Sequence, residues 1–245
     1  MLGSMQGLAQ VRRTMAATVG VALDLALPAE CVGCRREGPP LCRTCRPALD
    51  VRRHAAPGVA LGLPGELPAP LLQLEWCAPF SGVARRALHA LKYGGERRLA
   101  TPLGEAMADR WAVAGAGGTV LVPVPASPDR VRRRGYDQAV LLARVAADRL
   151  GLPVLEILER SRSTAAQFDL DRTARGSNVA GAFRLAPGSG RRGSSPATAS
   201  QGPRGEWVVL VDDVMTTGST LAACAATLLE AGAIGASAFT VARER

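Results

Sequence analysis

WVVLVDDVMTTGST, residues Trp207–Thr220, combines a short apolar run, two adjacent acids and a small hydroxyl-rich loop within fourteen residues. The apolar run Val208–Val211 lies between Gly205 and the acids, and its length and composition predict a strand buried on both faces. A periodic stretch follows, and Gly232 stands where a glycine often ends a helix. Apolar residues share one face of that helix at Leu221, Cys224, Ala225, Leu228 and Leu229. The predicted order is therefore strand, acids, loop and helix.

The loop and the acids suit two different parts of one ligand. The loop ends at a helix N-terminus, where free backbone N–H groups and the helix dipole favour an anion such as a phosphate monoester. The candidate phosphate ligands are Thr216, Thr217, Gly218, Ser219 and Thr220. Asp212 and Asp213 suit a vicinal diol, because each carboxylate accepts O–H hydrogen bonds. Together they describe a ribose 5-phosphate; the alternative is an ordinary turn with an N-cap and two solvated acids.

The whole fourteen-residue string resembles the signature with which type I phosphoribosyltransferases bind 5-phosphoribosyl 1-pyrophosphate (PRPP). The resemblance implies that Asp212 and Asp213 contact the ribose hydroxyls, that the following loop binds the 5-phosphate, and that Mg²⁺ accompanies PRPP. Purine-specific members usually carry an acid at the position of Thr216, where it meets the base. Because Thr216 has no carboxylate, the resemblance disfavours purine salvage.

A cysteine cluster, CVGCRREGPPLCRTC, lies near the N-terminus. Its two C-x-x-C pairs are separated by seven residues and consist of Cys31, Cys34, Cys42 and Cys45. Two such pairs predict a tetrahedral zinc site with four thiolate ligands, while disulfides are the alternative. Because four protein ligands leave no open coordination position, we expect this zinc to be structural.

Composition limits the classes of partner. The net charge of +9 and the pI of about 10.2 make an anionic partner plausible. Lys92 is the single lysine, so 29 of the 30 basic residues are arginine. An aromatic content of 4% argues against a broad base-stacking platform for single strands. No stretch approaches the ~20 uninterrupted apolar residues of a membrane span.

The sequence predicts a small module and one larger domain. We expect an N-terminal helix at 1–28, the Cys₄ zinc module at 29–50, a connector at 51–70 and a phosphoribosyltransferase-like domain at 71–245, with a disordered insert at 187–205. The N-terminus imitates a secretory signal, with two arginines before an apolar stretch. Asp24 interrupts that stretch and Glu30 precedes the first cysteine, so we expect a cytoplasmic protein.

After residue 115, predicted strands and helices alternate, which indicates a parallel α/β sheet. Strands are expected at 119–125 and 154–158, and a helix at 137–150. Between them, Arg130–Arg134 predict a basic loop at the carboxyl end of a strand, where parallel sheets bind ligands. The pyrophosphate or anion candidates are Lys92, Arg132, Arg133 and Arg134. The alternatives are that the basic loop is only a solvated loop and that Lys92 is a lysine retained by chance. Residues 161–183 are expected to form a lid.

These segments, in this order, are similar to the ComF family of competence-associated proteins. The matching stretches are CVGC…LCRTC, ALKYGG, LVPVPASPDRVRRRGYDQA, AAQFDLDRTARGSNVAGAF and WVVLVDDVMTTGSTL. The resemblance implies a zinc module joined to a type I phosphoribosyltransferase domain. Asp137 is a departure, because relatives commonly show asparagine there, and an aspartate would weaken anion binding if that asparagine donates to phosphate.

Two functions follow from that resemblance. One is phosphoribosyl transfer from PRPP with Mg²⁺, in which the protein positions groups and stabilises charge. The other is non-catalytic handling of nucleotides or single-stranded DNA during DNA uptake in natural transformation, with DNA-uptake proteins as further partners. No feature of the sequence identifies an acceptor.

Overall fold

The core of the protein is a parallel β-sheet. The computed structural model describes residues 30–57, 67–160, 181–187 and 202–244. The sheet consists of β1 (Leu74–Pro79), β2 (Val120–Pro123), β5 (Trp207–Met215) and β6 (Gly235–Arg243), in the order β1-β6-β5-β2. All three pairings are parallel, and an isolated parallel bridge joins Leu121 to Val154 beyond β2. The predicted parallel α/β sheet is confirmed.

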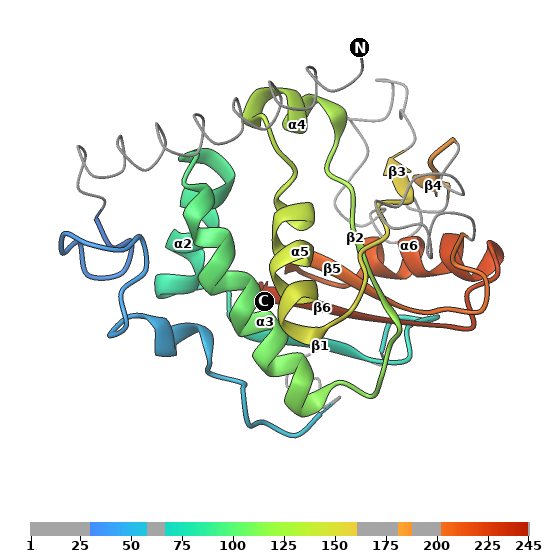
Figure 1. Ribbon diagram of the computed structural model, residues 1–245, viewed down its shortest axis with the longest axis horizontal. Coiled ribbons are helices and arrows are strands. Elements are labelled where there is room, and N and C mark those ends of the chain that lie inside the picture. Colours follow the sequence, from blue (N-terminus) through green and yellow to red (C-terminus); the bar gives the residue numbers. More distant parts are fainter. Residues whose placement is uncertain (1–29, 58–66, 161–180, 188–201, 245) are drawn as a thin grey trace, which may run out of the picture.

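Helices cover both faces of this sheet (Figure 1). One face carries α2 (Gly82–Tyr93), α3 (Ala100–Ala114) and α5 (Gln138–Leu150). The other carries α6 (Ser219–Glu230) and a two-stranded antiparallel sheet of β3 (Leu158–Arg160) and β4 (Phe183–Leu185). Three short helices complete the described chain: η1 (Arg46–Leu49), η2 (Arg97–Leu99) and α4 (Pro128–Arg134). Among the described helices, none has the length and apolar character needed to cross a bilayer.

Alternate residues of β5 explain why its apolar run is continuous. Val209 and Val211 pack with α2, α3 and α5, while Val208 and Leu210 pack with α6, and all four are fully buried. Burying a valine or leucine side chain contributes about 1.5–3 kcal/mol, so both layers depend on this strand. β5 therefore fixes the position of everything that follows it at its carboxyl end.

The structure differs from the sequence prediction at three boundaries. β5 continues to Met215, so the acid pair lies within the strand, paired with β6. Residues 130–134, predicted as a loop, belong to helix α4, which begins with Pro128 and ends at Gly135 with φ 77°. The strand predicted at 154–158 is reduced to a bridge at Val154, because the chain then leaves the sheet to form β3.

Several predictions fall outside the described residues. These are the N-terminal helix at 1–28, most of the expected lid at 161–183, and positions 188–201 of the predicted insert. The two parts of the connector that are described, 51–57 and 67–70, lie against the main domain, where Arg52 is buried.

Candidate functional site

The acid pair lies near the carboxyl end of β5 and has a lysine as its counterion. Asp213 is 4% exposed; its Oδ1 accepts a hydrogen bond from the backbone N–H of Val214 at 2.8 Å. The Nζ of Lys92, in the last turn of α2, lies 2.6 Å from Asp213 Oδ2. The half-buried Asp212 accepts the backbone N–H of Asp213 at 2.8 Å. The structure thus joins the diol candidates to one of the anion candidates.

The two carboxylates are electrostatically unequal. Burial raises the pKa of Asp212 well above its usual value, and the neighbouring carboxylate of Asp213 raises it further. The backbone N–H of Asp213 and the ammonium of Lys92 oppose this rise without cancelling it. One lysine therefore does not neutralise the pair, and a ligand that brings a cation or hydroxyl donors to Asp212 would relieve that cost.

The hydroxyl loop connects β5 to α6, as predicted. Gly218 has φ 81° and precedes the first residue of α6, and a Cβ built there would lie 2.9 Å from Cγ of Pro68. Thr216 and Thr217 are exposed, and the hydroxyls of Thr217 and Ser219 lie 2.6 Å apart. The loop therefore presents hydroxyls and the amino end of a twelve-residue helix at the same sheet edge as the acids.

A basic pocket of about 480 Å³ lies on the other side of Lys92. Its lining comes from the end of α2, the loop that follows it, and α4 with the residues after it: Lys92, Tyr93, Gly95, Arg130, Arg133, Arg134 and Tyr136. The guanidinium of Arg134 lies 5.1 Å from the ring centroid of Tyr93. The buried hydroxyl of Tyr136 donates to the carbonyl of Leu91, which holds the pocket wall to α2.

The structure brings three of the four predicted anion residues together. Lys92, Arg133 and Arg134 share the basic pocket with Arg130. Arg132 forms an ion pair with Asp129 and lines a different pocket of about 860 Å³, beside Arg160 and Arg184. Adjacent residues of a helix point about 100° apart, so forming α4 separates arginines that a loop would have left equivalent.

Asp137 has a structural role that explains an acid at this position. It is the N-cap of α5, where its Oδ1 accepts the N–H of Ala139 at 2.9 Å. Its Oδ2 accepts the N–H of Ala126 at 2.8 Å, which fixes the segment that follows β2. Burial raises the pKa of Asp137, although these backbone hydrogen bonds oppose the rise. Asparagine has one acceptor oxygen and could satisfy only one of the two N–H groups.

The cysteine cluster has the geometry of a tetrahedral metal site. The Sγ atoms of Cys31, Cys34, Cys42 and Cys45 all lie within 4.8 Å of one another. Zn–S bonds of about 2.3 Å place tetrahedral sulfurs about 3.8 Å apart, and the Cys34 and Cys42 sulfurs are separated by 3.7 Å. The six cysteines of the chain form no disulfide among themselves, and all of them are described.

The ionisation of these thiols also fits a bound cation. Burial opposes ionisation of Cys31, but backbone N–H groups from Cys42, Cys34 and Gly33 outweigh it and lower its pKa to about 6. Burial and the neighbouring sulfurs raise the pKa of Cys45 to about 12. A bound cation would favour the thiolate form of all four cysteines, and zinc bound by them would hold the two C-x-x-C pairs together.

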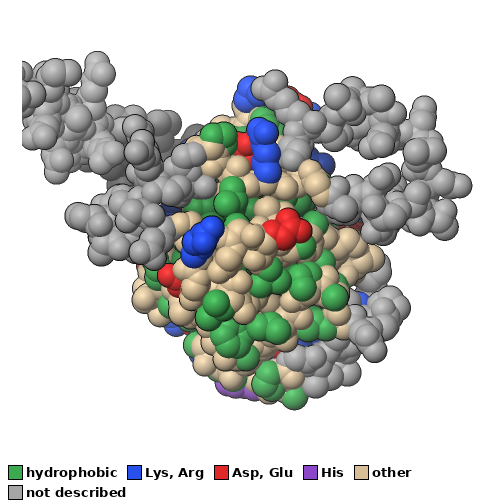
Figure 2. Space-filling view, turned by 90° about the vertical axis from the view of Figure 1, so that its right-hand side faces the viewer, with side chains coloured by type: hydrophobic (Ala, Val, Ile, Leu, Met, Phe, Trp, Pro, Cys, Tyr) green, Lys and Arg blue, Asp and Glu red, His purple; other side chains and the backbone are tan. Residues whose placement is uncertain are grey.

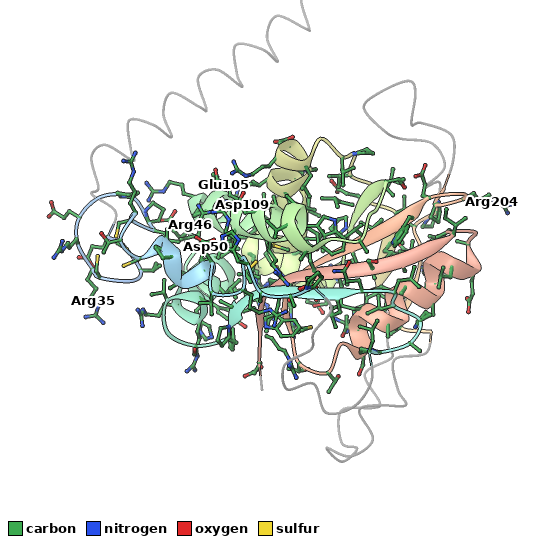
Figure 3. All side chains as sticks on the ribbon, turned by 90° about the horizontal axis from the view of Figure 1, so that it is seen from below. Arg35, Arg46, Asp50, Glu105, Asp109 and Arg204 are labelled. Carbon is green, nitrogen blue, oxygen red and sulfur yellow. The ribbon has the colours of Figure 1, made fainter. Side chains whose placement is uncertain are left out.

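The cysteine module is clamped to the main domain. Arg86 of α2 donates to the carbonyls of Val32 at 2.7 Å and Gly33 at 3.2 Å. Arg46 meets acids of α3, with Glu105 at 2.9 Å and Asp109 at 3.7 Å. Figure 3 shows Arg46, Asp50, Glu105 and Asp109 gathered between the module and α3, while Arg35 points away from them. Arg86 thus places the module in direct contact with α2, and Arg46 joins the module to α3.

Sequence reasoning missed a buried polar network on β1. Glu75 is fully buried and accepts hydrogen bonds from Arg110, Arg52 and Gln73. Arg110 also donates to the carbonyls of residues 53, 55 and 56, so it ties the chain after the cysteine module to α3. An acid in the otherwise apolar stretch LEWCAP was the available signal, because a charge on a buried strand requires a partner.

Residues 137–244 match the phosphoribosyl transferase domain family. Over 208 residues the chain is 29% identical to the DNA utilization protein YhgH of Salmonella typhi, covering 79% of this chain and 86% of that protein. The YhgH protein of Escherichia coli is 31% identical over 173 residues, covering 68% and 70%. Competence protein F of Haemophilus influenzae is 38% identical over 102 residues, covering 41% and 40%.

Two solved structures are also similar. The allosteric regulatory enzyme of purine biosynthesis is 21% identical, with a TM-score of 0.37 over 58% of this chain. The glutamine PRPP amidotransferase of B. subtilis is 21% identical, with a TM-score of 0.36 over 57%. The chain spans 25% of the length of each. With the family match, the parallel sheet confirms a phosphoribosyltransferase-type domain, joined here to a cysteine cluster that could hold a metal.

Proposed function

This chain belongs to the ComF family of phosphoribosyltransferase-like proteins, and we propose that it binds PRPP at the carboxyl end of β5 and transfers its phosphoribosyl group. One observation carries the proposal. The acid pair is followed directly by the hydroxyl loop at the end of β5, and it contacts Lys92, which also lines the basic pocket. PRPP has the same order of groups, with a 5-phosphate, a ribose diol and a pyrophosphate.

Each group of the ligand has a candidate partner. The free N–H groups at the start of α6 and the hydroxyls of residues 216–220 would bind the 5-phosphate. Asp212 and Asp213 would accept hydrogen bonds from the diol. Arg130, Arg133 and Arg134 would bind the pyrophosphate by charge-assisted hydrogen bonds.

In the transfer, the bond between C1 of ribose and the pyrophosphate oxygen breaks, and its electron pair leaves with pyrophosphate. An acceptor atom bonds to C1 and gives up its proton, while cationic groups stabilise the charge that develops on pyrophosphate. Mg²⁺ held near Asp212 would add to that stabilisation by neutralising negative charge on the pyrophosphate. Because Lys92 contacts Asp213, we expect the ligand and water to supply most of the metal's oxygen ligands.

Thermal unfolding with PRPP, ribose 5-phosphate and Mg²⁺ tests the proposal. Ligand at about 100 times its Kd stabilises a protein by about 2.7 kcal/mol, which raises Tm by roughly 5–10 °C in a chain of this size. The variant D212N/D213N should fold and lose this shift. A double variant stabilised by PRPP as strongly as wild type would refute the assigned site.

The two pockets on either side of α4 provide a matched pair of arginine variants. Arg133→Ala and Arg134→Ala should each weaken PRPP binding by about 10-fold or more, because a hydrogen bond to a charged group contributes about 1.5–3 kcal/mol. Arg132→Ala should leave binding unchanged, since Arg132 lies outside the basic pocket. Equal losses in all three variants would argue for a general effect of charge.

A second candidate function is binding of single-stranded DNA, and one observation favours it. Few aromatic side chains are present, yet three rings line the outer surface of α2: Phe80 and His89 have centroids 6.0 Å apart, and His89 and Tyr93 have centroids 5.5 Å apart. Tyr93 is 72% exposed, and Arg85 and Arg86 are exposed near His89, with which they line a third pocket. Bases stack on such rings while arginines bind the phosphates. Two relatives carry names that refer to DNA utilization and competence.

Positive charge is not spread evenly over the molecule. The face in Figure 2 shows isolated basic side chains on a surface that, where described, is mainly apolar and neutral. A titration with a short oligothymidine tests the α2 surface. Binding should weaken with salt by a log–log slope of about −0.7 per phosphate contacted. Tyr93→Ala should weaken it by about 5- to 150-fold, with Leu72→Ala, another exposed apolar residue, as control. Unchanged binding in Tyr93→Ala would exclude this surface.

A further inference from the structure

Lys92 closes the access to Asp213. Oδ1 of Asp213 is occupied by the backbone N–H of Val214. Oδ2 has less than 1 Å² of accessible surface, and Lys92 Nζ lies 2.6 Å from it. A ribose hydroxyl therefore cannot take Oδ2 of Asp213 while the ammonium stays in place. If the diol binds Oδ2 of Asp213, Lys92 has to move.

The basic pocket offers the ammonium a second position. Lys92 lies at the boundary between Asp213 and the pocket that contains Arg130, Arg133 and Arg134, so rotation of its flexible side chain suffices to exchange one for the other. When the pocket holds no anion, its arginines repel the ammonium and Asp213 attracts it. When an anion enters, the ammonium has a favourable partner on each side.

We propose that Lys92 is a mobile internal counterion, which moves from Asp213 to an anion in the basic pocket when a ribose diol takes its place. The proposal rests on the function proposed above, and it assigns Lys92 a positioning role that couples the two halves of the ligand. Sugar binding releases the ammonium toward the pocket, and the anion draws the ammonium away from the acid. Each half therefore favours binding of the other, although two anionic ligands would otherwise repel one another.

The proposed movement explains why this position has a lysine, the only one in the chain, and not an arginine. An arginine would form a bidentate, planar pair with Asp213 and would resist displacement, whereas an ammonium is a point charge on a flexible stem. Lys92→Arg keeps the charge, so it should lower the affinity for the sugar and reduce the coupling. Reduced coupling in Lys92→Arg would show that the coupling depends on movement of the cation and not only on its presence.

Calorimetric titration of the two half-ligands tests the coupling directly. The probes are inorganic pyrophosphate and 1,4-anhydroribitol 5-phosphate, a ribose 5-phosphate without the anomeric hydroxyl that would compete with pyrophosphate. Both are titrated at one fixed Mg²⁺ concentration, each alone and then with the other saturating. Coupling between sites is typically 5- to 150-fold, so we expect pyrophosphate to bind wild type about 10-fold more tightly when the sugar is present, and the reverse by the same factor.

Variants distinguish Lys92 from the rest of the pocket. Lys92→Met, and Lys92→Gln as a form that keeps a hydrogen-bond donor beside Asp213, should bind the sugar phosphate but lose the 10-fold coupling. Arg130→Met should weaken pyrophosphate binding and keep the coupling, because Arg130 lines the pocket without contacting Asp213. Full coupling in both Lys92 variants, or independent binding of the halves to wild type, would overturn the proposal. Failure of wild type to bind either half would overturn the proposed function as well.

Discussion

Glu75 provides a sharp test of what holds the cysteine module's connecting segment to the main domain. This carboxylate is fully buried in β1 and lies 2.6 Å from Nη2 and 3.1 Å from Nε of Arg110. Arg52 and Gln73 donate to it from 3.4 Å and 3.0 Å. Replacement by glutamine preserves the shape and removes the charge, which leaves the buried guanidinium of Arg110 without its counterion.

The expected loss follows from that burial. Removing one partner of a buried ion pair typically costs about 3–5 kcal/mol, because the remaining charge is left uncompensated. At roughly 2–4 °C per kcal/mol for a chain of this size, Glu75→Gln should lower Tm by roughly 6–20 °C. Glu156→Gln is the matched control, since Glu156 pairs with Arg144 at the surface, where such pairs contribute about 0–1 kcal/mol.

Thermal and urea unfolding of the two variants measure the difference. If Glu75 and Arg110 act as a pair, adding Arg110→Met to Glu75→Gln should cost less than the sum of the two single changes. Arg110→Met should also increase proteolysis of residues 53–56, whose carbonyls accept from Arg110. A Glu75→Gln variant within about 1 kcal/mol of wild type would refute this account of the network.

Asp212→Asn should raise the Tm of the ligand-free protein at neutral pH, because the raised pKa of Asp212 makes its charged form unfavourable in the fold. The gain in Tm should vanish near pH 3 and grow as the pH rises above about 3.9, the ordinary pKa of an aspartate. A constant difference in Tm across a pH series of melting curves would contradict this prediction. Gly218→Ala should lower the free energy of unfolding, measured in urea, by about 1–3 kcal/mol, because φ is 81° and the added Cβ meets Pro68. The same variant should bind ribose 5-phosphate more weakly. Unchanged binding of ribose 5-phosphate would place its phosphate elsewhere. Elemental analysis should find one zinc per chain, which a strong chelator removes with a loss of Tm, whereas metal-free protein of full stability would exclude a structural metal.

The fold could be predicted from the sequence where the information is local. Val208–Val211 fills both faces of the strand, and the periodic stretch after it has one apolar face, so the strand, loop and helix were visible in one segment. The end of β5 was not visible, because residues 212–215 are extended through pairing with residues 240–243 of β6. Asp212 and Asp213 interrupt the apolar run without interrupting the strand.

Helix α4 shows that a charge-rich segment can hide the helix signals in its own sequence. Pro128 lies in the first turn and Gly135 has a positive φ after the last residue, which is the usual arrangement of proline at the start and glycine just past the end of a helix. Four arginines in five residues masked that pattern. The consequence for the site is large, because the helix directs Arg133 and Arg134 to one pocket and Arg132 to another.

The contact between Lys92 and Asp213 could not be predicted, because it joins residues 121 positions apart through the packing of α2 against the sheet. This contact bears on function through the order of charges at the carboxyl ends of the strands. The loop at residues 216–220 is uncharged, the acid pair is incompletely neutralised, and the pocket beyond it is strongly basic. A nucleic acid strand carries negative charge at every step and would meet the incompletely neutralised pair of Asp212 and Asp213 on entering. The proposed ligand PRPP would present a diol at that point, so under the proposed function PRPP binds beside the acid pair, and the outer surface of α2, around His89 and Tyr93, is left as the place where DNA would bind.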